Sequence, residues 1–238
     1  NLIDASLSPN GQWLVVALVK DDSWRDEGDI MPNYVTDDGT IKSEEVRRRV
    51  ADAKPQPMTI VLLDLVNHSK HELSYDTLPG WDEDVLAAVK TENHQREGKT
   101  YESKPAPRAL RIMYRGAMKW NAQGDKLALM LEASWDNKDR WIANVDFNSK
   151  TLVSKHRLHD DAWVNYAFND FGWFNHSDQL YFQSEESGFS HLYVLDEKGQ
   201  TRQLTSGRFE TNDTTLSKDD KFIYFKGNKK HPGIYEIY

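Results

Sequence analysis

Two short patterns recur four times, in the same order, along this chain of 238 residues. The first is a polar turn of Ser or Asn with Gly and Asp, followed by a run of β-forming residues. It occupies residues 6–19, 119–132, 172–185 and 215–228. The second is a short apolar strand, at residues 59–65, 140–146, 191–196 and 233–238. Such a repeat constrains the fold strongly, because each unit has to bury its apolar faces against its neighbours.

The spacing of the repeat indicates a β-propeller. Asn121 and Asn175, which occupy equivalent turn positions, are 54 residues apart, and Asn175 and Ser217 are 42 apart. A period of roughly 40–50 residues with about four short strands is typical of a propeller blade. A β-sandwich with hairpins at similar spacing is the alternative. Because both patterns recur in one order, we favour an all-β fold, a partial β-propeller of about four four-stranded blades with one helical insertion.

The repeat also predicts where the blades begin and end. The expected units are blade 1 (about 2–78, with an insert at 20–57), an inter-blade insertion (79–115), blade 2 (about 116–162), blade 3 (about 163–210) and a truncated blade 4 (about 211–238). An open arc of blades leaves sheet edges exposed, and exposed edges favour association. We therefore expect a homo-oligomer that forms through blade edges.

The insert at 20–57 is polar and highly charged. Glu44 and Glu45 stand directly before three arginines at 47–49. A charge run of this kind is typical of a solvated loop or of a short helix whose charges neutralise one another. We expect no binding role for these two glutamates.

The insertion at 79–115 contains the pattern of a helix. Asp82 is expected to cap its start, and Gly98 is expected to end it. Three apolar residues would share one face of that helix, namely Val85, Leu86 and Val89. Insertions of this size between blades are where a propeller can acquire function, although most are decoration.

The composition excludes several classes of function. The chain has 38 Asp and Glu against 30 Lys and Arg, a net charge of −8, which argues against a general nucleic-acid binder. It has no stretch of 18 uncharged apolar residues, so no membrane span is expected. The absence of Cys excludes thiol catalysis, thiolate metal sites and disulfides. Phosphate-binding glycine-rich loops are also absent, and we expect no cofactor.

No catalytic or metal-binding constellation emerges from the motifs. Ser190 is the nearest match to the G-x-S-x-G elbow of a serine hydrolase, but the second Gly is missing. Ser190 and His191 lie in a predicted strand, where neighbouring side chains point to opposite faces. The cluster at 159–161, His-Asp-Asp, lacks a second His at ligand spacing and is better explained as a surface turn.

Two features could bind a ligand. The paired carboxylates Glu185 and Glu186 could seat a substrate ammonium, although they fall at a hairpin where polar residues are expected anyway. The segment at 160–174 gathers six aromatic residues around Asn165. Packing between blades explains some of them, and exposed ones at a propeller mouth would suit a peptide or a sugar.

Residues 163–210 resemble the propeller of the prolyl oligopeptidase superfamily of serine peptidases, nearest its dipeptidyl peptidase IV-like branch. The strings that carry this resemblance are FNDFGWF, SEESGFSHLYVLD and QLTSGRFE. Residues 78–99 also resemble an inter-blade insertion of large bacterial members. The polar turns alone would be less specific, because propellers of the TolB type share them.

The resemblance implies a non-catalytic propeller that gates and binds peptide substrates over its own C-terminal α/β-hydrolase domain. That domain carries the Ser-Asp-His triad in the family and is not in this chain. The segment after Trp163 faces the active-site cavity in relatives, which makes Asn165, Tyr166 and Phe168 the cleft candidates. Glu185 and Glu186 correspond to a blade hairpin and are weaker candidates.

Several alternatives stay open at this point. The amino-terminus-gripping Glu pair of dipeptidyl peptidases has no matching string here, so dipeptidyl, acylaminoacyl and endopeptidase specificities remain possible. A periplasmic or secreted location is expected from the resemblance. A stand-alone TolB-like propeller that binds a protein partner is the alternative function. A propeller glycosidase would need two suitably spaced carboxylates, which the sequence does not nominate.

Overall fold

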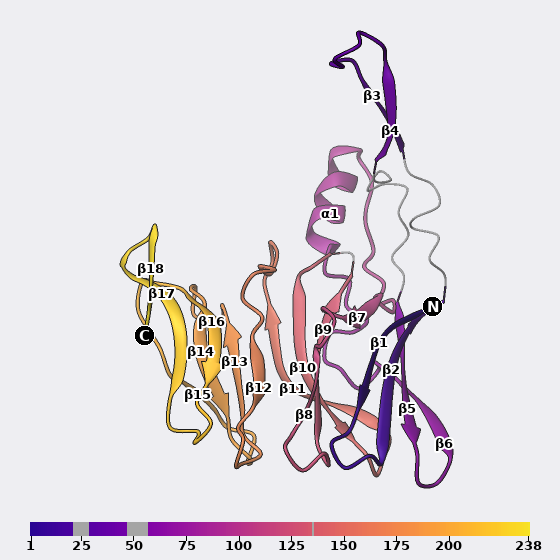
Figure 1. Ribbon diagram of the computed structural model, residues 1–238. Coiled ribbons are helices and arrows are strands. Elements are labelled where there is room, and N and C mark those ends of the chain that lie inside the picture. The colour runs from indigo at the N-terminus through magenta and orange to yellow at the C-terminus, as the bar shows by residue number, and fades with distance from the viewer. Residues whose placement is uncertain (21–28, 47–56, 135) are drawn as a thin grey trace.

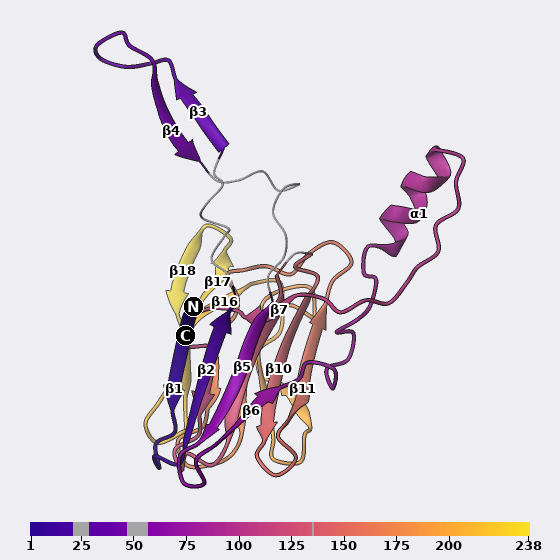
Figure 2. The same cartoon turned by 90° about the vertical axis from the view of Figure 1, so that its right-hand side faces the viewer.

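The computed structural model describes residues 1–20, 29–46, 57–134 and 136–238. Its body is a row of four antiparallel sheets that stand side by side (Figure 1). A hairpin and the one helix of the described residues project from the upper end of this row, as a second view confirms (Figure 2). In the first, third and fourth sheets the strands pair in chain order, so that each of these sheets is a meander.

The first and third sheets have four strands each. The first, in the order β1-β2-β5-β6, contains β1 (Leu2–Leu7), β2 (Trp13–Val19), β5 (Met58–Asp64) and β6 (Ser69–Leu73). The third, in the order β12-β13-β14-β15, contains β12 (Phe171–Trp173), β13 (Leu180–Ser184), β14 (His191–Leu195) and β15 (Thr201–Gln203).

The second and fourth sheets vary this plan. The second has the order β11-β10-β9-β7, and β8 also pairs with β9, so that two short strands share one edge. Its bounds are β7 (Leu110–Ile112), β8 (Met118–Trp120), β9 (Leu127–Ala133), β10 (Asp139–Asp146) and β11 (Thr151–His159). The fourth contains β16 (Thr211–Leu216), β17 (Ile223–His231) and β18 (Ile234–Ile237). The sheets confirm the predicted all-β propeller fold with one helical insertion, and the expected blade boundaries stay a prediction.

The recurring polar turns close the first hairpin of each sheet in a similar way. In three of them the anchor residue donates its backbone N–H to the carbonyl five residues on. These bonds run from Ser8 to Trp13 (2.8 Å), from Asn121 to Lys126 (3.0 Å) and from Ser217 to Phe222 (2.8 Å). In the third sheet the bond is displaced by one residue and joins Phe174 to Gln179 (2.9 Å). All four turns lie at the lower end of the sheets in Figure 1.

The same turns also tie each sheet to the next. An Asn side chain of one turn donates a hydrogen bond to the turn of the following sheet. The bonds are Asn10 Nδ2 to Gly124 O (2.9 Å), Asn121 Nδ2 to Asp178 Oδ1 (2.9 Å) and Asn175 Nδ2 to Asp220 Oδ1 (2.6 Å). The repeat therefore specifies the contact between sheets as well as the turn within each sheet.

The core consists of two layers on either side of the second sheet. Val15, Ile60 and Leu62 of the first sheet pack with Leu129 and Leu131 of β9. On the other face, Ala128 and Met130 of β9 pack with residues of the third sheet, chiefly Phe171, Phe182 and Tyr193. Because alternate side chains of a strand point to opposite faces, β9 has to be apolar on both, and every one of its residues is buried.

The prediction of a loop or short helix in the first insert is wrong where the structure describes it. Glu44 and Glu45 lie in β4 (Lys42–Val46), which pairs with β3 (Asp29–Asn33) in a hairpin. The arginines at 47–49 lie outside the described residues. The hairpin forms because Asp38 accepts both the N–H and the hydroxyl of Thr40, while Gly39 adopts φ +69°. The hydrogen bonds of this turn favour a hairpin over the helix that the charge run indicated.

The predicted helix exists but begins later than expected. α1 spans Ala87–Arg96, and its N-cap residue makes no side-chain capping bond, so the capping role of Asp82 is wrong. The backbone carbonyl of Asp82 instead accepts the N–H of Ala106 (2.9 Å), which joins the two legs of the insertion. Gly98 follows the helix with φ +71°, as a helix-ending glycine should.

A buried ion cluster fastens the insertion to the second sheet. Asp139 is fully buried and accepts hydrogen bonds from Arg108 Nη1 (2.6 Å), Arg157 Nε (2.8 Å) and His159 Nδ1 (2.8 Å). Arg157 also binds Glu83 of the insertion (2.6 Å). Burial works against the charged form of Asp139, but the two arginines more than compensate and hold the pKa of its carboxyl below its ordinary value.

Removing that carboxylate should be strongly destabilising. Asp139→Ala leaves two guanidinium groups near the buried site without their shared partner, and we expect the free energy of unfolding to fall by about 3–5 kcal/mol. Urea denaturation measures the change. Glu92→Ala breaks an exposed pair with Arg96 on α1 and should cost less than about 0.5 kcal/mol. Equal losses in the two variants would contradict a structural role for the cluster.

The contact between the first two turns predicts that substitution of two equivalent glycines lowers stability by different amounts. Gly11 and Gly124 occupy equivalent turn positions, with φ +71° and +73°. A Cβ at Gly11 would meet no atom within 4 Å, whereas one at Gly124 would lie 2.8 Å from the backbone nitrogen of Asn10. Gly11→Ala should cost about 1–2 kcal/mol for the left-handed conformation alone, and Gly124→Ala should cost clearly more in the same urea experiment. Equal losses of unfolding free energy in the two variants would mean that the close approach of Gly124 to Asn10 does not contribute to stability.

Candidate functional site

The predicted cleft residues lie in loops at the upper end of the second and third sheets, opposite the polar turns (Figure 1). Three connections meet there: 134 and 136–138 between β9 and β10, 160–170 between β11 and β12, and 185–190 between β13 and β14. Antiparallel meanders place alternate connections at the same end of a sheet. The topology thus brings Asn165, Tyr166 and Glu185 into one region.

Arg140, which the sequence analysis did not nominate, holds this region together. Its Nη1 donates to Glu132 Oε2 (2.7 Å), and its Nη2 donates to the backbone oxygen of Asn165 (3.4 Å). Its guanidinium also lies over the ring of Tyr166, 5.5 Å from the centroid. The side chain of Arg140 is only 4% exposed and that of Glu132 only 1%. A Glu inside an otherwise apolar strand was the available signal, because a buried carboxylate needs a cationic partner.

Glu185 approaches the same loop from the third sheet. Its Oε2 accepts the backbone N–H of Asn165 (3.2 Å). The Asn165 side chain in turn accepts the N–H of Ala167 (2.9 Å), which forms a local turn. Burial raises the pKa of the Glu185 carboxyl above its ordinary value, although the Asn165 N–H and Arg140 favour its charged form. The structure therefore joins Asn165, Tyr166 and Glu185 around Arg140.

Glu186 and Phe168 are placed differently. Glu186 Oε2 lies 3.7 Å from Nε2 of His156 rather than near Arg140, so the two neighbouring glutamates have different partners. Burial lowers the pKa of His156 to about 4, and this contact is therefore not an ion pair at neutral pH. Phe168 is half-buried, and within the described ranges no hydrogen bond or ring contact joins it to Arg140 or Glu185.

A cavity of about 590 Å³ lies beside Tyr166, at the edge formed by the first strands of three sheets. Its lining includes Tyr114, Asp170 and Thr214, which lie next to β7, next to β12 and within β16. Asp170 Oδ2 accepts the backbone N–H of Thr214 (2.7 Å), and Tyr114 donates its hydroxyl to Asn169 O (3.1 Å). Burial raises the pKa of Tyr114 to about 12. The cavity thus borders the Arg140 region and has a polar lining.

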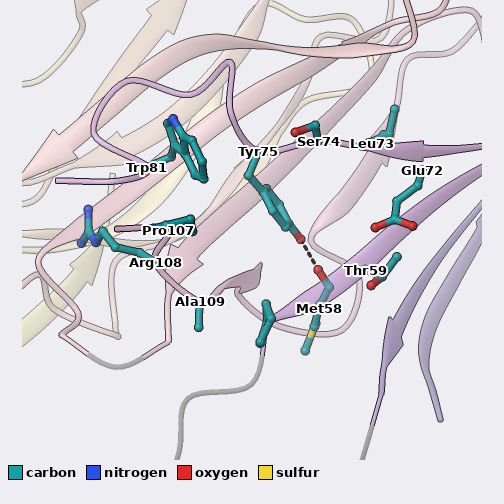
Figure 3. A pocket seen from close by; sticks show the side chains of 11 residues that line it. Met58, Thr59, Glu72, Leu73, Ser74, Tyr75, Trp81, Pro107, Arg108 and Ala109 are labelled. Carbon is teal, nitrogen blue, oxygen red and sulfur yellow. Dashed lines mark hydrogen bonds between the residues drawn. The ribbon is translucent and has the colours of Figure 1, made fainter. Parts of the chain in front are cut away.

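A second cavity, also of about 590 Å³, lies between the first sheet and the insertion (Figure 3). Tyr75 and Trp81 face it, and the Tyr75 hydroxyl donates to the backbone oxygen of Met58 (2.7 Å). Its lining Arg108 is already bound to Asp136 and Asp139. None of the predicted site residues lines this cavity.

The groups considered for catalysis are engaged in structural hydrogen bonds. Ser190 Oγ donates to Thr211 O (2.9 Å), and the ring nitrogens of His191 contact Thr205 Oγ1 and Gly207 O (3.1 Å each). His159 contacts Asp139 of the ion cluster. Over the described ranges, no group of three or more His, Cys, Asp and Glu residues could hold a metal ion. The described helix is neither long nor apolar enough to span a membrane.

The buried His156 predicts a loss of stability in mild acid. Its folded pKa of about 4 lies below the ordinary value of 6.5, so between these pH values the unfolded chain binds a proton that the folded chain does not. Unfolding free energy should therefore fall as the pH drops from 6.5 to 4, by up to roughly 3 kcal/mol from this residue. His156→Gln should flatten this part of the profile in urea titrations, whereas His231→Gln, at the exposed end of β17, should not. An unchanged profile in His156→Gln would exclude His156 as the cause.

Comparison with known proteins agrees with this architecture. The family model described as "Dipeptidyl peptidase IV (DPP IV) N-terminal region" matches residues 88–238. No curated protein matches the chain. The crystal structure of Porphyromonas gingivalis dipeptidyl peptidase 4 superposes with a TM-score of 0.65 at 16% identity, and the match covers 98% of this chain and 28% of that one.

A second solved structure is similar over nearly the same range. The putative dipeptidyl aminopeptidase IV from Bacteroides ovatus superposes with a TM-score of 0.58 at 12% identity, covering 94% of this chain and 29% of that one. The chain therefore spans less than a third of either similar protein. At such identities the superpositions establish the fold, while the family model covers more than half of the present sequence. The chain belongs to the family of dipeptidyl peptidase IV N-terminal regions.

Proposed function

We propose that this chain is the non-catalytic propeller portion of a serine exo- or oligopeptidase, in which it binds and gates peptide substrates over a hydrolase domain. Membership of the dipeptidyl peptidase IV N-terminal family supports a peptidase-associated propeller. The observation that carries the peptide-binding role is the cluster of Arg140, Asn165, Tyr166 and Glu185 beside a cavity. A periplasmic or secreted location is part of the same proposal.

The cluster offers the groups that a peptide requires. Tyr166 is 54% exposed and presents a flat apolar ring for a side chain. Glu185 is a half-buried carboxylate and can accept hydrogen bonds from an ammonium group. Burial raises the pKa of Glu185, which means that it disfavours the charged carboxylate. A bound ammonium would stabilise that charge. This chemistry favours a peptide with a free amino terminus.

The placement of several loops and of the insertion at one end of the sheets supports a gating role. The loops at 160–170 and 185–190 lie at this end, and the insertion with α1 projects from it (Figure 2). In this proposal such loops admit an extended peptide and exclude a folded protein. Loops carried on a rigid scaffold are a common way to restrict access to a site.

A stand-alone propeller that binds a protein partner is the second candidate. The hairpin β3–β4 favours it, since Ile30, Tyr34 and Val35 are large apolar residues that lie exposed on a projecting element. In a peptidase the same surface could contact the rest of the enzyme. The family match favours the peptidase propeller over the stand-alone alternative.

Peptide binding can be tested by isothermal titration calorimetry of this chain. The probe is the amide of Ala-Ala-Gln-Ala, with its amino terminus either free or acetylated. A charge-assisted contact to Glu185 is worth about 1.5–3 kcal/mol, so the free peptide should bind at least about tenfold more tightly. Glu185→Gln should abolish this difference.

Glu102→Gln is the matched control, because it removes the same charge from an exposed position of the insertion. It should leave both affinities unchanged. If neither peptide binds at millimolar concentration, peptide binding by this propeller is refuted. Equal affinity for the free and acetylated peptides would refute the role of Glu185.

A further inference from the structure

We propose that Arg111 forms a carboxylate-binding site at the edge of the second sheet, so that the peptides preferred by this propeller carry a carboxylate. This inference rests on the proposed function and extends it to a class of substrate. The carboxylate could belong to an acidic side chain or to the carboxyl terminus of the peptide. Both have the same planar oxygens that a guanidinium binds through two parallel hydrogen bonds.

Arg111 belongs to a row of three charged residues across three strands. In the strand register, Glu132 of β9 stands opposite Arg111 of β7 on one side and opposite Arg140 of β10 on the other. Directly opposed residues of antiparallel strands share a face of the sheet. Glu132 Oε1 accepts from Arg111 Nε and Glu132 Oε2 accepts from Arg140 Nη1, both at 2.7 Å.

Within the row of three residues, two arginines share one carboxylate. Glu132 carries one negative charge, which Arg140 alone would balance. Arg140 is committed to the interior, where it also binds the loops at Asn137 and Asn165. Arg111 is a second cation on the same carboxylate, and its side chain is 36% exposed. Glu185 lies near Arg140 as a further carboxylate, so Arg111 is the cation of the row that is both partly exposed and shared with no second carboxylate of the described residues.

The donors of Arg111 are available in a fixed orientation. Its Nε is used by Glu132, and its two Nη nitrogens have no hydrogen bond to any residue that the structure describes. A guanidinium has five N–H donors, of which four are on the Nη nitrogens. The bond to a buried carboxylate restrains the side chain before a ligand arrives, so less conformational entropy is lost on binding.

The position of Arg111 matches the proposed cleft. It lies on the edge strand β7, two residues before Met113, which lines the cavity beside Tyr166. Tyr166 connects the two regions, because its ring contacts Arg140 and also lines that cavity. A peptide that extends from Tyr166 past Met113 along this strand would reach the partly exposed side chain of Arg111.

Lys119 is the other cation to consider, since it lines the same cavity. Its ammonium has no ion pair with any described residue. A lysine offers a point charge on a flexible stem, whereas Arg111 offers a planar fork that is already oriented. A selective carboxylate site is therefore better supported at Arg111, and Lys119 provides a discriminating variant.

Calorimetric titration of this chain with three peptides tests the inference. The neutral peptide is the amide of Ala-Ala-Gln-Ala, the second is the amide of Ala-Ala-Glu-Ala, and the third is Ala-Ala-Gln-Ala with a free carboxyl terminus. At least one carboxylate peptide should bind about tenfold more tightly than the neutral one, the size expected of a charge-assisted contact. The peptide that gains affinity identifies the source of the carboxylate.

Arg111→Gln should remove this preference while the neutral peptide retains its affinity, which shows at the same time that the variant is folded. Arg202→Gln, which removes the same charge from an exposed position on β15, should retain the preference. Equal affinity of the wild type for all three peptides would overturn the role of Arg111 and leave peptide binding intact. A preference that survives Arg111→Gln but is lost in Lys119→Gln would also overturn it. Absence of binding by every peptide would refute the proposed function together with this inference.

Discussion

The enclosure of β9 between two neighbouring sheets is the constraint on which the rest of the molecule depends. Every residue of this strand is buried, so its apolar side chains supply both core layers. The one acidic residue in the strand, Glu132, must then find cationic partners within the protein. Those partners are Arg111 and Arg140, and Arg140 in turn holds the loop with Asn165 and Tyr166. Packing of the core and placement of the candidate site thus have a common origin.

The repeat made most of the fold predictable from the sequence. The turn anchors Ser8, Asn121 and Ser217 close their hairpins with one pattern of hydrogen bonds, and Gly98 follows the helix as expected. Local patterns were less reliable in the insertions, where charge runs fit a helix and a strand equally well. Glu44 and Glu45 therefore proved to lie in a hairpin, and the helix began without the help of Asp82.

The candidate site was only partly predictable, because its organising contacts are tertiary. Asn165, Tyr166 and Glu185 were nominated from the sequence, and the structure brings them together. The acidic residue in β9 signals that a cationic partner is needed, but which cation it is depends on strand register, and the role of Arg140 also depends on a loop 25 residues away. Glu185 begins the turn and Glu186 lies within it, where its carboxylate approaches His156. A sequence does not show this difference between neighbours.

Because hydrogen bonds join the polar turns of neighbouring sheets, the connections at that end of the sheets tolerate changes in length less well than those at the other end. At the turn end, a change in length would break contacts with two sheets at once, because Asn121 serves its own turn and the next one. At the opposite end the connections vary from short loops to long insertions without disturbing strand pairing. New specificities can therefore arise by lengthening loops at one rim, while the other rim preserves the spacing of the blades.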